Sequence, residues 1–265
     1  MLQKAKEIRV LTATCISSIG AGHIGGSLSI VDVLTVLYYK HMNIDPTNPK
    51  LENRDRLVVS KGHAGPAVYA TLAHKGYFPK EELLTLNKFG TNLPSHCDMN
   101  KTPGIDMTTG SLGQGISCAV GMALGARIRK TNEYIYTIIG DGESQEGQVW
   151  EAAMFASQRK LDNLIVFLDY NKYQLDDATD NINSLGDVHS KWESFGFYTQ
   201  SIDGNNIEEI DQAIIKAKNN KGTPSMIVLN TIKGKGVSFV EAAKANNHSM
   251  PITKEDLEKI FDELK

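Results

Sequence analysis

Two polar side chains follow short apolar runs at positions thirty residues apart. Asp141 lies in a G-D-G turn directly after the run 134–140, and Asn171 lies two residues after the run 164–169. Carboxylate and amide oxygens are ligands that Mg²⁺ or Ca²⁺ prefers. Two such ligands are too few for a metal held by protein alone, and Mg²⁺ usually adds phosphate oxygens and water. The pair therefore predicts a metal site shared with a phosphate-bearing ligand.

The glycines around Asp141 favour the same interpretation. Gly140 and Gly142 allow the backbone to approach a diphosphate closely, and a helix that follows would direct its N-terminus at the negative charge. Taken alone, G-D-G indicates a tight turn. The asparagine after the next apolar run makes a ligand site the better explanation.

Alternating strands and helices are needed to bring these residues together. We expect buried strands at 56–60, 134–140, 164–169 and 225–230. Helices are expected at 1–18, 30–41, 64–75 and 115–129, between the strands of the second half, and at 253–264. This order predicts an α/β fold with a parallel β-sheet flanked by helices, in which Asp141 and Asn171 emerge at one edge. We expect one domain over 1–265, with a short helical extension from about 240 to the end.

Further motifs carry a resemblance to a known family. They are A-G-H-I-G-G (21–26), S-K-G-H-A-G (60–65), S-H-C-D-M (95–99), T-P-G-I-D-M-T-T-G-S-L-G-Q-G (102–115) and T-I-K-G-K-G-V-S-F (231–239). With G-D-G and the later asparagine, their order and spacing resemble transketolase. The resemblance covers essentially the whole chain, but only the amino-terminal third to half of a full transketolase. It implies the thiamine diphosphate-binding domain that contacts the diphosphate.

The resemblance implies a set of cofactor-binding residues. Thiamine diphosphate would be bound together with Mg²⁺ or Ca²⁺. The metal ligands would be Asp141, Asn171 and the backbone carbonyl of Tyr173. The cofactor contacts would be His63, Gly110, Ser111, Leu112, Gly142, Glu146 and Asn171.

Four histidines would take part in the reaction. His23, His96 and His248 match histidines that line the substrate channel of the family, and His63 matches the one near the diphosphate and the thiazolium ring. Histidine suits proton movement on sugar hydroxyls because its ordinary pKa lies near 6.5. The implied reaction moves a two-carbon ketol unit from a ketose phosphate to an aldose phosphate.

A partner chain is expected. In the family, a glutamate in a second, pyrimidine-binding domain activates the cofactor, and the sequence after 230 leaves no room for such a domain. We therefore expect the amino-terminal subunit of a split transketolase, inactive by itself. It would form an α2β2 assembly with a C-terminal transketolase subunit.

Other functions compete with this interpretation. The chain could belong to another two-chain thiamine enzyme, such as a 2-oxo acid dehydrogenase α subunit or a relative of deoxyxylulose-phosphate synthase, or it could bind the cofactor without catalysis. G-A-G-H-I-G (20–25) also satisfies G-x-G-x-x-G, but a dinucleotide site needs a strand directly before the glycines, and a helix is expected there.

Composition narrows the classes of partner. The 265 residues carry a formal net charge of -3, which gives no reason to expect nucleic acid or an anionic membrane as a partner.

Three cysteines without a C-x-x-C motif favour a cytoplasmic protein with free thiols. Lys4, Lys6 and Arg9 before a moderately apolar stretch imitate a signal peptide, but the apolar spacing fits a helix better. Glu143 is interpreted as a surface helix-start carboxylate. Lys233 and Lys235 in K-G-K-G could form a phosphate-binding loop, but a solvated turn after the last strand is the preferred interpretation.

Overall fold

The computed structural model describes all residues, 1–265. Its main element is a five-stranded, fully parallel sheet in the order β2-β3-β4-β6-β5. The strands are β2 (Arg56–Val59), β3 (Ile135–Gly140), β4 (Leu164–Tyr170), β5 (Tyr198–Asp203) and β6 (Ser225–Asn230). The expected fold class is confirmed. β5 is not among the expected strands, because its residues alternate between buried and exposed at the sheet edge and form no continuous apolar run.

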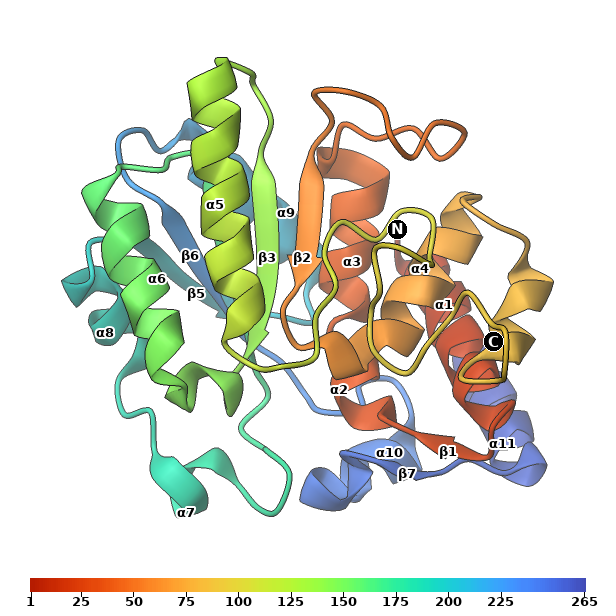
Figure 1. Ribbon diagram of the computed structural model, residues 1–265. Coiled ribbons are helices and arrows are strands. Elements are labelled where there is room, and N and C mark those ends of the chain that lie inside the picture. The colour runs from red at the N-terminus through yellow and green to blue at the C-terminus, as the bar shows by residue number, and fades with distance from the viewer.

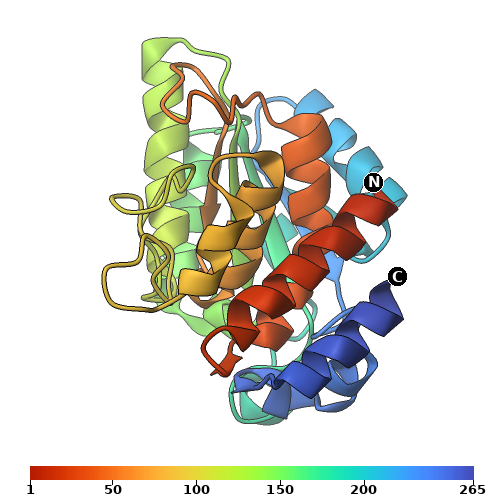
Figure 2. The same ribbon diagram turned by 90° about the vertical axis from the view of Figure 1, so that its right-hand side faces the viewer.

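Helices cover both faces of this sheet (Figures 1 and 2). The longer ones are α1 (Leu2–Ser17), α4 (Gly65–Lys75), α5 (Gln114–Arg129), α6 (Gly147–Gln158), α9 (Ile207–Asn219) and α11 (Lys254–Leu264). The shorter ones are α2 (Ile24–Leu28), α3 (Val31–Val36), α7 (Thr179–Asn183), α8 (Val188–Ser194) and α10 (Ser238–Ala242). The helix expected at 30–41 is α3 followed by a π-helical turn at Leu37–His41. No helix of the chain is both long and apolar enough to cross a membrane.

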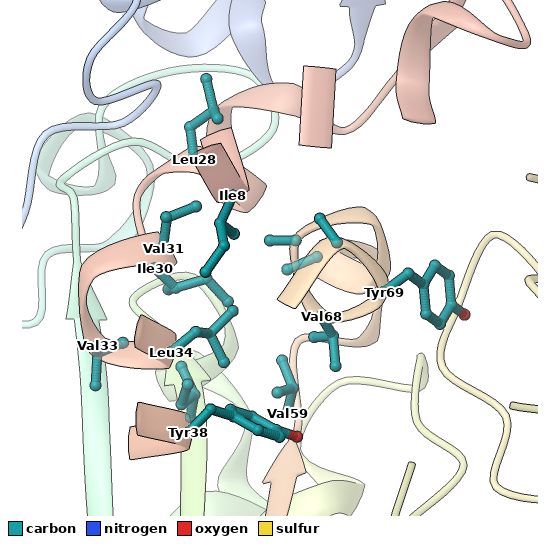
Figure 3. Packing of buried hydrophobic residues seen from close by; sticks show 14 of the residues in the cluster. Ile8, Leu28, Ile30, Val31, Val33, Leu34, Tyr38, Val59, Val68 and Tyr69 are labelled. Atoms are coloured by element: carbon teal, nitrogen blue, oxygen red, sulfur yellow. The ribbon is translucent and has the colours of Figure 1, made fainter. Parts of the chain in front are cut away.

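Each central strand sends side chains into two separate cores. In β3, Tyr136 and Ile138 pack with α1, α3, α4 and α9, whereas Ile135 and Ile139 pack with α5, α6 and α8. Figure 3 shows part of the first core, where Ile8, Leu34 and Val68 meet beside β2. Covering both faces requires apolar residues at successive positions, which is why these strands read as continuous apolar runs.

The carboxyl ends of the strands lie together at the bottom of Figure 1. A two-stranded antiparallel sheet lies at the same end of the molecule and joins β1 (Ala21–Gly22) to β7 (Met250–Pro251). The C-terminal helix α11 packs against α1, so both ends of the chain lie on the same side (Figure 2). Open parallel sheets bind ligands beyond the carboxyl ends of their strands. This end of the molecule is therefore where a site is expected.

Candidate active site

One cavity of about 410 Å³ lies at this end of the sheet. It gathers all the predicted site residues except Ser111: His23, His63, His96, Gly110, Leu112, Asp141, Gly142, Glu146, Asn171, Tyr173 and His248. Ser111 is exposed in the turn before α5, and its carbonyl accepts a hydrogen bond from the Gln114 N–H at 3.3 Å. A larger hollow of about 740 Å³ lies between the start of α1 and the start of α9, but none of these motifs reaches it.

The floor of the cavity holds oxygen donors. Asp141 is 3% exposed, and its two oxygens accept hydrogen bonds from the N–H groups of Gly142 (2.8 Å) and Lys172 (2.6 Å). Burial, and next the negative charge of Asp169, raise the pKa of Asp141 to about 6. No lysine, arginine or histidine forms an ion pair with it. A buried carboxylate without a cation partner is a good position for a metal ion.

The rest of the donor set is suited to a hard cation. The Asn171 side-chain oxygen lies 3.1 Å from the Tyr173 N–H, which places the amide beside the backbone of the third expected ligand. No three His, Cys, Asp or Glu residues of the chain are grouped so as to bind a metal. A carboxylate, an amide and a carbonyl instead fit Mg²⁺ or Ca²⁺ completed by diphosphate oxygens and water.

Asp169, which the sequence analysis does not select, fixes the orientation of Asn171. It is fully buried and accepts hydrogen bonds from Asn171 Nδ2 (2.8 Å), Ser29 Oγ (2.7 Å) and the Thr231 hydroxyl. Lys61 Nζ lies 2.6 Å from the same carboxylate. Although burial acts to raise it, Lys61 holds the pKa of Asp169 below its ordinary value. Since the amide nitrogen of Asn171 donates to Asp169, the amide oxygen is left on the opposite side, where it accepts from the Tyr173 N–H.

Glu143 is not a surface carboxylate, so that prediction is wrong. Its side chain is buried, with 2% of the residue exposed. It accepts hydrogen bonds from the Ser60 hydroxyl and from the N–H groups of Gly113 (2.9 Å) and Gly140 (3.0 Å). Burial raises the pKa of Glu143, and the three hydrogen bonds oppose that shift.

Lys233 does not lie in a solvated turn either. It is 4% exposed, and its ammonium group lies 3.1 Å from the Tyr173 carbonyl and 3.2 Å from the Gln174 carbonyl. Burial lowers its pKa to about 8. The ammonium group lines the cavity next to the expected metal ligands, where it would offset the charge of a bound diphosphate.

The four predicted histidines lie close together in the wall of the cavity. The His23 ring lies 5.3 Å from both His63 and His248 and 6.0 Å from His96, and the His63 and His248 rings are 5.2 Å apart, measured between centroids. Pairing of β1 with β7 brings together His23 and His248, which are far apart in the sequence. Gly25 permits this approach, because a Cβ there would lie 2.0 Å from Asn247 Oδ1.

His96 is held against the turn that precedes α5. Gly110 has a φ of +146°, and a Cβ on it would lie 3.0 Å from His96 Cδ2. Only glycine adopts this backbone conformation readily. Gly110 therefore lets the T-T-G-S-L-G turn and the S-H-C loop share the cavity wall.

The environment keeps three of these histidines neutral. Burial is the largest cause for each: it lowers the pKa of His23, lowers the pKa of His63 well below its ordinary range, and lowers the pKa of His248 to about 4. Neighbouring cations contribute, Lys61 at His63 and Lys233 at His248. A neutral imidazole has one donor and one acceptor nitrogen, so at pH 7 these rings can exchange protons with hydroxyl groups.

Besides Gly140, the cavity is lined by further residues that the sequence analysis does not select. They are Gly26, Lys61, Glu143, Gln145, Gln174, Leu175 and Lys233. Lys61 and Glu143 could have been selected from the sequence, because each is a charged residue within three positions of the end of an apolar strand. The G-x-G-x-x-G alternative at 20–25 finds no support, because helix α1 precedes it and β1 is not part of the parallel sheet.

Comparisons with known proteins agree with this geometry. The chain matches the family described as "Transketolase, thiamine diphosphate binding domain" over residues 2–264. It is 59% identical over 262 residues to the 6-deoxy-6-sulfo-D-fructose transketolase subunit SqwG of Clostridium sp. (strain MSTE9), covering 99% of this chain and 95% of that protein. It is 40% identical to an apulose-4-phosphate transketolase subunit of Phocaeicola vulgatus, covering 92% of this chain and 86% of that protein.

A solved structure shows the same fold. Transketolase from Leishmania mexicana superposes with a TM-score of 0.93 at 31% sequence identity, and the match covers 100% of this chain but only 41% of that one. The chain belongs to the transketolase family, in which it corresponds to the N-terminal, thiamine diphosphate-binding part.

Proposed function

We propose that this chain is the N-terminal subunit of a two-chain transketolase that moves a two-carbon ketol unit from a ketose to an aldose. The observation that carries the proposal is the composition of a single cavity. Buried oxygen ligands for a metal–diphosphate and four clustered histidines line the same cavity.

Thiamine diphosphate and Mg²⁺ would be held by the floor. Asp141, Asn171 and the Tyr173 carbonyl would bind the metal, and Gly142 and Lys233 would face the diphosphate. His63, Gly110, Ser111, Leu112 and Glu146 would complete the cofactor contacts. When bound, the cofactor supplies the electron sink needed to cleave a carbon–carbon bond beside a carbonyl.

The chain's own contribution to the chemistry is the histidine cluster. His23, His96 and His248 would donate to and accept from the hydroxyl and carbonyl groups of the sugar. Because His23 and His248 are neutral at pH 7, each can give up one proton while accepting another on its second nitrogen.

A partner chain would complete the site. Two relatives that match this chain over most of their length are named as transketolase subunits. The partner would supply the pyrimidine-binding domain and the glutamate that activates the cofactor, and an α2β2 assembly is the simplest symmetric arrangement. Glu146 is exposed at the edge of the cavity, where a second chain could reach it.

The assignment of residues 1–265 to one domain stays a prediction.

Two kinds of sugar donor are candidates. A ketose phosphate, as in pentose phosphate metabolism, follows from the family as a whole. The 59% identity to a 6-deoxy-6-sulfo-D-fructose transketolase subunit favours a ketose that carries a sulfonate in place of the phosphate. We propose the sulfonated ketose as the preferred donor and a cytoplasmic location, which suits free Cys15, Cys97 and Cys118.

The test is co-purification with the partner, followed by an assay on a panel of donors. The panel contains 6-deoxy-6-sulfo-D-fructose, fructose 6-phosphate and xylulose 5-phosphate with an aldose phosphate acceptor, and a 2-oxo acid as the alternative substrate class. Ketol transfer with the highest kcat/KM for the sulfonated ketose is expected. Decarboxylation of the 2-oxo acid without ketol transfer would contradict the proposal.

A further inference from the structure

We propose that Glu143 is the positioning residue that sets the three cofactor-binding loops relative to one another. This inference rests on the proposed function, since it concerns the same cavity. It assigns a role to a buried carboxylate that contributes neither to the metal ligands nor to the histidine cluster.

The three donors to Glu143 come from three separate segments of the cavity wall. Ser60 precedes Lys61 and His63 at the end of β2, Gly113 follows Leu112 at the start of α5, and Gly140 precedes Asp141 at the end of β3. Each segment contributes at least one residue to the cavity lining. The carboxylate of Glu143 therefore contacts all three segments.

The contacts to the three segments require that both carboxylate oxygens of Glu143 act as hydrogen-bond acceptors. Glu143 Oε1 accepts from Ser60 and Gly113, and Oε2 accepts from Gly140. Backbone N–H groups can only donate, so only a carboxylate satisfies both loops at once. A second feature supports tight positioning: a Cβ on Gly115 would lie 2.8 Å from Ser60 Cα, so these two segments lie in close contact.

Replacing Glu143 by glutamine changes the hydrogen bonding of the side chain without changing its volume. The variant Glu143→Gln keeps the shape but turns one oxygen into an NH₂ group, which would then face the N–H of Gly113 or of Gly140. Two donors cannot satisfy each other, so one loop must move away. The matched control is Glu258→Gln, an exposed glutamate on α11 with no side-chain hydrogen bond.

The experiment measures the dissociation constant of thiamine diphosphate with saturating Mg²⁺, using this chain co-purified with its partner. Measurements are made well below the unfolding midpoint, where wild type and variants are folded. Glu143→Gln is expected to raise the dissociation constant by about tenfold or more, equivalent to about 1.4 kcal/mol, and Glu258→Gln to leave it unchanged.

Hydrogen exchange adds a readout that does not depend on the cofactor. Glu143→Gln should speed exchange in 111–115 or 138–142 but not in β6. If Glu143→Gln does not fold, Ser60→Ala serves instead: it removes one donor and should weaken cofactor binding about threefold while Gly113 and Gly140 stay protected.

The inference would be overturned if Glu143→Gln bound the cofactor within about twofold of wild type and showed unchanged hydrogen exchange in both segments. For Ser60→Ala, the inference is overturned by cofactor affinity equal to that of wild type. Failure of the wild-type complex to bind thiamine diphosphate would overturn the proposed function itself and this inference with it. The two failures are distinguishable because the first requires a wild-type complex that binds.

Discussion

At the scale of single residues, the site is a small number of buried charges with defined partners. Asp141 lacks a cation, Asp169 is paired with Lys61, and Glu143 accepts three hydrogen bonds. Burying a charge is costly unless the group is paired, hydrogen-bonded or bound to a metal. Among the three buried carboxylates, Asp141 alone has neither a cation nor a side-chain donor, and it is the one expected to bind the metal.

Removal of that carboxylate should abolish metal-dependent cofactor binding. Asp141→Ala is expected to weaken Mg²⁺-dependent thiamine diphosphate binding by about 100-fold or more, about 2.7 kcal/mol, because no other carboxylate is directed at the metal position. Calorimetry on the co-purified complex measures this. The exposed control Asp262→Ala should bind as wild type does, and unchanged binding in Asp141→Ala would exclude the site.

His248 should make the metal-free chain less stable in acid. Its pKa is lowered to about 4 in the folded chain, whereas an unfolded histidine titrates near 6.5, so the unfolded state binds more protons between these values. Stability from this group is therefore lost as pH falls from about 6.5 to 4, by at most about 1.4 kcal/mol per pH unit.

The comparison with His248→Asn measures the effect. Urea unfolding of wild type and variant at pH 7, 6 and 5 should show the variant gaining relative stability as pH falls. Parallel pH curves for the two proteins would show that His248 titrates alike in both states.

At the scale of elements, loops from different strands are fastened together beneath the cofactor site. Lys61 Nζ joins the end of β2 to Asp169 in β4 and, at 2.7 Å, to the Gly26 carbonyl of α2. Thr231, just after β6, donates to the same aspartate. The network therefore links β2 to β4 across the intervening strand β3, and β4 to its neighbour β6.

Breaking the network should destabilise the fold. Lys61→Met leaves Asp169 buried without its cation, and loss of one member of a buried ion pair typically costs about 3–5 kcal/mol. We expect a loss of that size in the free energy of unfolding, measured by urea titration. A loss below about 1 kcal/mol would mean that the hydroxyl and amide donors suffice for Asp169.

Gly25→Ala tests the contact between the N-terminal and C-terminal parts of the chain, and Gly121→Ala serves as the comparison. Gly25→Ala should destabilise by about 1–3 kcal/mol, because its Cβ would overlap Asn247 and displace the segment that carries His248. In α5, a Cβ on Gly121 would meet no atom within 4 Å apart from its own helix backbone, so Gly121→Ala should stabilise by about 0.5–1 kcal/mol. Urea unfolding measures both changes. Equal effects of the two substitutions would contradict the overlap.

At the scale of the whole molecule, we propose that the chain forms one side of an active site that a partner chain completes. All the residues expected to contact the cofactor's diphosphate lie at the carboxyl edge of one sheet, and the cavity there opens to solvent past Leu112, Glu146 and Leu175. The exposed apolar side chains at this edge are consistent with a partner that covers it.

The purified chain alone should therefore show no ketol transfer. Addition of the partner subunit should restore turnover together with a complex of higher mass, measured by size-exclusion chromatography with light scattering. Full turnover by the isolated chain would contradict the two-chain proposal.

The sequence by itself determined the parallel fold, the strand-end positions of Asp141 and Asn171, and the motifs that carry the four histidines. These features are local: apolar periodicity marks a buried strand, and residues just after it must lie at the sheet edge. Only the tertiary structure decided that β1 pairs with β7 beside His23 and His248, and that Glu143 and Lys233 are buried. The physical reason is that burial of a charged side chain depends on donors and loops from distant segments, which local periodicity does not encode.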